Sequence, residues 1–100
     1  MSGNRIVLNG KILTIDPLRY TPAGIPALNL TLVHNSRQVE AGMEREVECE
    51  VQVVAIGELA QQAARCKVED GIRIQGFLAR KSRKSTQLVL HANKIELLEI

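Results

Sequence analysis

Strict alternation of apolar and polar residues over residues 44–56 is the feature that most constrains how this chain folds. Val47, Cys49, Val51 and Val53 fall in one phase, and the glutamates and the glutamine between them fall in the other. A period of two predicts a β-strand with one face in the core and one face in water. The four apolar residues are therefore the predicted core face, and the glutamates are a solvated charged face rather than an acid–base pair.

Four further segments alternate in the same way, and the chain between them is rich in residues that break regular structure. The additional predicted strands cover residues 4–13, 27–34, 71–79 and 87–98. Residues 16–26 contain three prolines and a glycine and are expected to form a loop, and residues 35–43 are polar and are expected to form a long connection. Only residues 57–67 repeat apolar positions at helical spacing, which predicts one short helix.

The predicted order is therefore three strands, a helix and two strands, all within a single domain over residues 1–100. An all-β chain with five strands and one short helix between strands three and four is typical of the oligonucleotide-binding (OB) barrel. Gly10 and Gly76 interrupt predicted strands, and the apolar phase slips near Asn93. Kinks and bulges of this kind are what a closed, strongly coiled sheet requires.

The sequence offers little for catalysis or for metal binding. It contains no nucleophile elbow, phosphate-binding loop or metal-binding helix motif, so an enzyme is not expected and no cofactor is predicted. Cys49 and Cys66 are predicted to be buried, reduced thiols, and His34 and His91 lack metal-ligand spacing. Because no signal peptide or membrane-spanning run is evident, a cytoplasmic location without membrane contact is expected.

The strongest functional signal is a basic segment between the fourth and fifth predicted strands. It contains Arg80, Lys81, Arg83 and Lys84 within five residues and has no acidic residue. In OB barrels this loop and the loop between strands one and two flank the nucleic-acid groove. A cationic hairpin there can bind the phosphates of a single strand, although a solvated hairpin tip is the alternative.

The chain has only two aromatic side chains that could stack on a base, Tyr20 and Phe77. Tyr20 follows Arg19 in the first loop, where the pair offers a ring and a cation, but the ring could equally cover the barrel end. Phe77 has outward parity relative to Ile72 and Ile74. We expect a bulge at Gly76 to turn Phe77 into the core.

Several collinear segments resemble the family of primosomal replication protein N, also called PriB. The resemblance covers nearly the whole chain and rests on these segments: Asn4-Arg5-Ile6-Val7-Leu8, Pro22-Ala23-Gly24-Ile25-Pro26, Leu32-Val33-His34, Ala41-Gly42, Ile74-Gln75-Gly76-Phe77, Val89-Leu90-His91-Ala92 and Ile95-Glu96-Leu97. It implies a homodimer of OB folds that binds single-stranded DNA. It further implies a place in replication restart, where the protein bridges the PriA helicase and DNA at a stalled fork and hands over to a primosome loader protein.

The family's basic positions match Arg19, Lys81, Arg83 and Lys84, but other DNA contacts of the family are absent here. Two positions that can be aromatic in the family are occupied here by Glu48 and Met43. Two positions that are basic in the family are occupied here by Asn35 and Gln87. Since a stacked base contributes about 1–3 kcal/mol, these departures predict weaker DNA binding than in a typical member. A protein adaptor for PriA with secondary DNA binding is therefore the alternative function.

Overall fold

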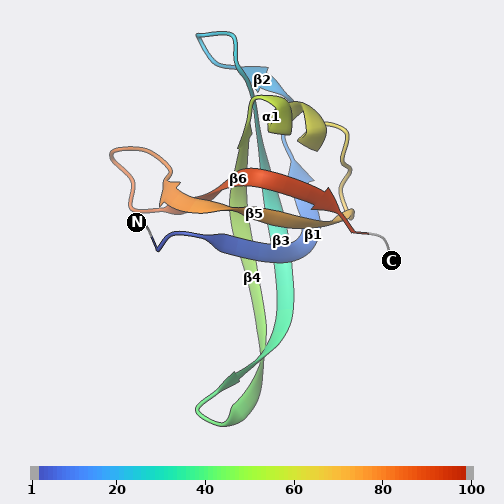
Figure 1. Cartoon of the computed structure of the whole chain (residues 1–100), viewed down its shortest axis with the longest axis vertical. Coiled ribbons are helices and arrows are strands. Elements are labelled where there is room, and N and C mark those ends of the chain that lie inside the picture. Colours follow the sequence, from blue (N-terminus) through green and yellow to red (C-terminus); the bar gives the residue numbers. More distant parts are fainter. Residues whose placement is uncertain (1–2, 99–100) are drawn as a thin grey trace.

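The computed structural model describes residues 3–98 as six strands and one short helix (Figure 1). The elements are β1 (Ile6–Ile15), β2 (Arg19–Tyr20), β3 (Pro26–Glu40), β4 (Met43–Ile56), α1 (Glu58–Ala63), β5 (Gly71–Arg80) and β6 (Leu88–Leu97). The strand order is β1-β5-β6-β4-β3-β2, and β1 also pairs with β3. Five strands therefore close a barrel, β2 is a two-residue addition at the edge of β3, and the predicted all-β OB architecture is confirmed.

Closure of the barrel depends on a change of partner within β1. Residues 6–11 pair with β5, and residues 11–15 pair with β3. Gly10 lies at this change, where a Cβ atom would come within 2.4 Å of the carbonyl oxygen of Val33. Such an approach leaves no room for a side chain at this position. The irregularity of register in β1 lies further along, between Ile12 and Thr14.

The core is entirely aliphatic and lies inside the barrel. Its largest fully buried side chains are Ile12, Leu28, Leu32, Val53, Ile72, Ile74 and Leu90. The helix α1 adds Ala60 and Ala63, which are also buried against this cluster. In β3 and β5 the leucines and isoleucines that the alternation predicts to face inward are buried. The residues between them are mainly polar and face outward.

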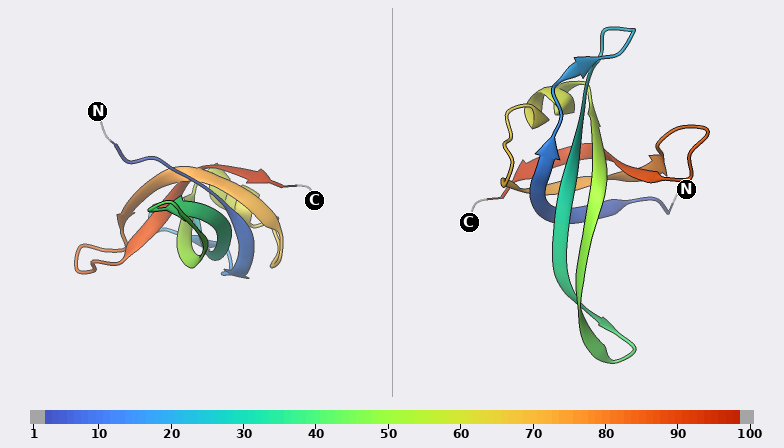
Figure 2. Two further views of the ribbon diagram at one scale, coloured as in Figure 1. Left: turned by 90° about the horizontal axis from the view of Figure 1, so that it is seen from below. Right: turned by 180° about the vertical axis from the view of Figure 1, so that it is seen from behind.

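Residues 35–43 do not form the predicted long connection. They belong to β3 and β4, which pair without interruption from Ala27 opposite Ile56 to Glu40 opposite Met43. Ala41 and Gly42 have φ values of 53° and 77° and form the two-residue turn. Residues 35–48 form a two-stranded ribbon, here called the β3–β4 arm, that projects beyond the barrel (Figures 1 and 2).

Two residues of β4 that were predicted to face the core do not lie in it. Cys49 is exposed and Val47 is only half-buried, whereas Val51 packs against the core and Val53 is fully buried. The alternation in β4 continues past the end of the barrel, where no second layer covers its apolar phase. Only the part of the strand that runs along the barrel therefore buries its apolar side chains.

Phe77 does not enter the core as predicted, and its ring side chain remains 38% exposed. The register passes from Gln75 opposite Lys94 to Gly76 opposite Ala92, so the extra residue of the bulge is Asn93 in β6. The predicted phase slip near Asn93 is confirmed, but β5 itself keeps its phase. Phe77 consequently points outward, opposite in phase to Ile74.

Candidate nucleic-acid interface

The predicted basic hairpin is a closed loop between β5 and β6. The backbone N–H of Lys81 donates to the carbonyl of Gln87 at 2.8 Å, and the N–H of Ser85 donates to the carbonyl of Ser82 at 3.2 Å. The guanidinium of Arg80 donates to the carbonyl oxygen of Arg83 at 3.2 Å. These contacts fix the backbone and leave the cationic side chains exposed.

The cations of this loop are not neutralised within the subunit. The ion pairs found over residues 3–98 join Arg37 to Glu44 and Glu46, Arg45 to Glu40, and Lys94 to Glu96. Within that part of the chain, no ion pair joins the side chains of residues 80–84 to a carboxylate. Their charge is therefore directed to solvent and to any anion that approaches.

Arg19 and Lys81 come to the same patch on the outer face of β3 and β4, although they are far apart in sequence. Arg19 lies on β2, and its guanidinium donates to Oδ1 of Asn29 on β3 at 2.8 Å. Lys81 lines a hollow that also includes Asn29, Thr31 and Gln52, together with Thr14 and Asp16. The cationic patch formed by Arg19 and Lys81 thus lies over polar side chains that can bind phosphate or base edges, with the carboxylate of Asp16 beside it.

The other predicted site residues are exposed, Tyr20 on the edge strand β2 and Arg83 and Lys84 in the loop between β5 and β6. Tyr20 is 62% exposed and pairs through its backbone with Pro26, so it does not cover the barrel end. Arg83 and Lys84 are exposed in the loop between β5 and β6. The structure therefore places both Arg19 and Lys81 beside Asn29, whereas contact of Tyr20, Arg83 and Lys84 with the same ligand remains a prediction.

The outer face of β3 and β4 changes the sign of its charge along its length. Cross-strand pairs place Thr31 beside Gln52, Val33 beside Glu50, and Asn35 beside Glu48 on this same face. Further along the arm the face carries Glu44 and Glu46, which Arg37 contacts at 3.4 Å each. The patch near the barrel is cationic and the arm is acidic, so phosphates are attracted to one end and repelled from the other.

Sequence reasoning missed a stacked aromatic pair on the opposite side of the barrel. The rings of Phe77 on β5 and His91 on β6 are nearly parallel, with an interplanar angle of 5° and centroids 5.1 Å apart. The outward parity of Phe77 was visible in the sequence. The pairing of His91 with Phe77 depends on the bulge at Asn93. The sequence pattern does not show at which residue this bulge lies.

The remaining candidates for chemistry do not form a site. Cys66 is half-buried, and desolvation, with a smaller effect of Asp70, raises the pKa of its thiol. Within residues 3–98 no cluster of three or more His, Cys, Asp or Glu residues is arranged to hold a metal ion. In the same range no helix is both long and apolar enough to cross a membrane.

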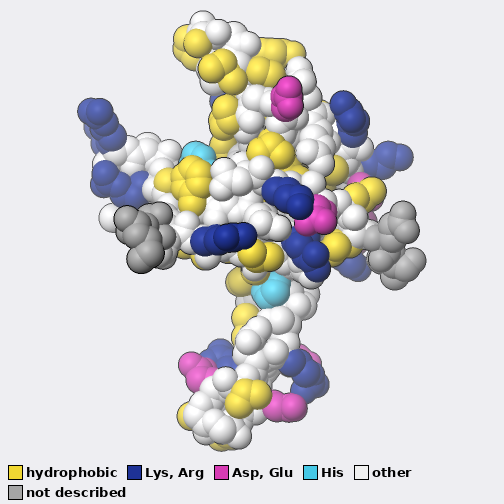
Figure 3. Space-filling model, in the orientation of Figure 1, with side chains coloured by type: hydrophobic (Ala, Val, Ile, Leu, Met, Phe, Trp, Pro, Cys, Tyr) yellow, Lys and Arg dark blue, Asp and Glu magenta, His cyan; other side chains and the backbone are white. Residues whose placement is uncertain are grey.

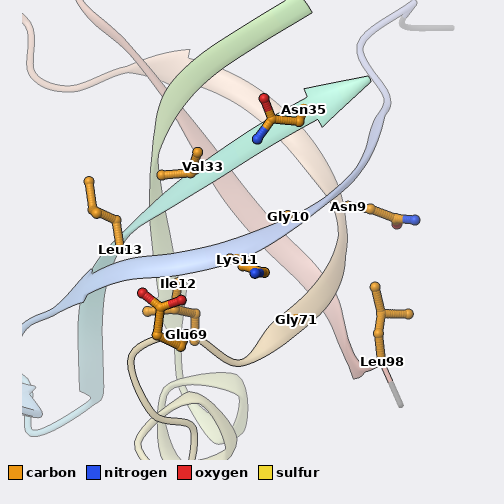
Figure 4. Close-up of a pocket in the computed structure, with 10 residues that line it drawn as sticks. All are labelled: Asn9, Gly10, Lys11, Ile12, Leu13, Val33, Asn35, Glu69, Gly71 and Leu98. Carbon is orange, nitrogen blue, oxygen red and sulfur yellow. The ribbon is translucent and has the colours of Figure 1, made fainter. Parts of the chain in front are cut away.

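A separate hollow lies where β1 changes partners (Figure 4). It is lined by Gly10, Ile12 and Leu98 and by one cation and one acid, Lys11 and Glu69. Its mixed charge and largely apolar lining do not suit a nucleic-acid backbone. The candidate interface is therefore the cationic patch and the basic loop rather than this hollow.

The fold defines the chain as an OB-fold protein, and residues 4–94 match the model of a family described as "another single-strand binding protein family". Among curated relatives, replication restart protein PriB of Nitrosomonas europaea is 41% identical over 88 residues, covering 88% of this chain and 82% of that protein. PriB of Photorhabdus laumondii is 35% identical over 102 residues, covering 99% and 97%. The chain belongs to the PriB family of replication restart proteins.

Solved structures agree with this assignment. PriB from Ralstonia solanacearum has a TM-score of 0.88 and 31% sequence identity, covering 98% of this chain and 100% of that chain. The single-stranded DNA-binding protein from Thermus aquaticus has a TM-score of 0.78 and 29% identity, covering 96% of this chain and 50% of that chain. The chain therefore shares one barrel with proteins whose names describe replication restart and single-strand binding.

Proposed function

We propose that this protein is an accessory single-stranded DNA-binding protein of replication restart. The observation that carries the proposal is the meeting of Arg19 and Lys81 on the outer face of β3 and β4. Phosphates bind these two cations and the side chains of Arg80, Arg83 and Lys84, while Tyr20 stacks on a base. The names of the PriB relatives and of the single-strand binding family support the same role.

The proposal extends to the protein's partners. The protein acts in the cytoplasm as a homodimer, bridges the PriA helicase to single-stranded DNA at a stalled fork and passes the complex to a primosome loader protein. Over residues 6–10, β1 pairs with β5 but has no second strand partner among the described residues. An open strand edge of this kind is able to pair with a second copy, which supports the dimer.

The test is a fluorescence-anisotropy titration of labelled single-stranded DNA over a range of salt concentrations. Charge reversal of Lys81, Arg83 and Lys84 should flatten the salt dependence, because each lost phosphate contact reduces the slope by about one. The matched control reverses Lys11, Arg65 and Lys67, which are exposed, take part in none of the ion pairs above and lie outside the basic loop and the arm. An unchanged slope in the loop variant would show that the loop does not contact phosphate.

A second candidate function is favoured by the acidic arm. Glu48 and Met43 stand where an aromatic side chain would strengthen DNA binding, and the arm repels phosphate. On this account the protein is mainly an adaptor for PriA and binds DNA weakly. Titration of PriA with and without DNA distinguishes the two functions, and a low-nanomolar dissociation constant for single-stranded DNA at physiological salt excludes the adaptor.

A further inference from the structure

A row of three side chains crosses the outward face of the layer formed by β1, β5 and β6. Phe77 on β5 lies opposite His91 on β6, and their rings are stacked. Ile6, the first residue of β1, lies opposite Gly76, and Arg5 immediately before it lines a hollow together with Phe77. Figure 3 shows this face, with Lys and Arg side chains over β1 and β5 near exposed hydrophobic side chains and a histidine.

The backbone around this row is held rigidly. A Cβ atom on Gly76 would lie 1.8 Å from the carbonyl oxygen of His91, so β5 and β6 approach each other more closely than a side chain permits. The amide of Asn4 donates to the carbonyl of Leu78 at 2.8 Å and accepts from its N–H at 2.9 Å. The close approach positions the two rings against each other, and the amide fixes the start of β1 beside them.

Polar side chains lie beside the ring of Phe77. Arg5, Gln75 and Asn93 line one hollow together with Phe77. A guanidinium and two amides beside an exposed ring are the groups that bind a phosphate, donate to base edges and stack on a base.

The charge of this face also favours an anionic ligand. By strand register, the outward side chains of the layer include Arg73, Lys94 and Glu96 in addition to Arg5. Glu96 is paired with Lys94 at 3.8 Å, so the described carboxylate on this face is already partly neutralised. The face therefore carries a net positive charge around the rings, in contrast to the acidic arm.

We propose that Arg5, Phe77 and His91 form a second contact site for single-stranded DNA, on the side of the barrel opposite the cationic patch. Figure 2 shows the two layers from behind, with β3 and β4 in front of β5 and β6. A base stacks on the Phe77–His91 pair, and Arg5 binds an adjacent phosphate. A long strand then contacts both sides of one subunit, whereas a short strand occupies only the patch. This inference rests on the proposed DNA-binding function.

Photocrosslinking tests the proposal directly. The intact protein is irradiated with an oligonucleotide of about 30 nucleotides that contains 5-iododeoxyuridine, and tryptic peptides are mapped by mass spectrometry. Trypsin releases residues 74–80, 85–94 and 20–37 as separate peptides, which contain Phe77, His91 and Tyr20 respectively. We expect the crosslinked residue, located by fragmentation of the peptides, to be Phe77 or His91, because the ends of these peptides belong to the basic loop. Crosslinks confined to residues 20–37 would overturn the second site and leave the proposed function standing, whereas the absence of any DNA binding would overturn both.

Two substitutions provide an independent test that does not require the crosslink. Phe77→Leu keeps an apolar side chain and Arg5→Gln keeps a polar one, and Val68→Ala is a control at an exposed apolar position elsewhere. Loss of one stacked base should weaken binding of the long strand about 5-fold or more and leave a strand of about 8 nucleotides unaffected. Equal weakening for both lengths would contradict the proposal. A fall in the light-scattering mass of Phe77→Leu would show that this face binds a second copy instead.

Discussion

Removing acidic charge from the arm next to the cationic patch should strengthen binding of single-stranded DNA. The informative variant is Glu48→Gln with Glu50→Gln, because neither glutamate takes part in the ion pairs found over residues 3–98. Both lie on the outer face of β3 and β4, in line with Gln52 of the patch. Glutamine keeps the shape of the side chain, so the strand pairing should not change.

The magnitude follows from the strand geometry. With a rise of about 3.4 Å per residue, Glu50 and Glu48 lie about 7 and 14 Å along the strand from Gln52. In water their repulsion of one phosphate held there is about 0.4 kcal/mol at 0.1 M salt and about 0.7 kcal/mol at 0.01 M salt after screening. For the phosphate held there, the variant should bind about 2-fold more tightly at 0.1 M salt and about 3-fold more tightly at 0.01 M salt.

The assay is an anisotropy titration at these two salt concentrations with the same oligonucleotide. A control variant, Glu58→Gln with Glu69→Gln, loses the same net charge at positions outside the outer face of β3 and β4, and neither residue takes part in these ion pairs. We expect the control to change affinity much less than the test variant. Equal effects of the two variants would show that net charge, and not the position of the acidic face, controls binding. No tightening at low salt would show that DNA does not lie near Gln52.

Four further predictions concern stability and thiol chemistry. Gly76→Ala should destabilise the fold by about 1–3 kcal/mol or prevent folding, because its Cβ would collide with the carbonyl of His91, and thermal denaturation measures this. Leu32→Ala should lower the free energy of unfolding by about 2–5 kcal/mol in a urea titration, because Leu32 is fully buried. Cys49 should react with a thiol reagent faster than Cys66, because Cys49 is exposed and burial raises the pKa of the Cys66 thiol. The protonated Cys66 thiol favours the folded state, so this contribution to stability should be lost as pH rises through its folded pKa.

The barrel could be predicted from the sequence because its strands have one face in the core and one in water. Residues 44–56 and the inward phase of Ile72 and Ile74 show that alternation directly, and the glycines mark the bends. The arm could not be predicted in the same way. Both of its faces are in solvent, so residues 35–43 lack an apolar phase, and a polar strand resembles a polar loop.

The candidate site was only partly predictable for a different reason. The charges of residues 80–84 are visible in the sequence, whereas the meeting of Arg19 with Lys81 depends on how the barrel closes. The sequence predicts a bulge in β5, which would turn Phe77 into the core. The extra residue lies in β6 instead, and an apolar pattern alone does not show which of two paired strands contains the insertion.

Tyr20, the only tyrosine of a chain without tryptophan, stands in solvent on the edge strand β2. Nearly all of the intrinsic ultraviolet emission of the protein therefore originates from one ring outside the core. Denaturation should change this emission little, because the ring is already hydrated in the native state. A nucleobase that stacks on the ring should quench it strongly, so the protein carries its own optical reporter of ligand contact at that edge.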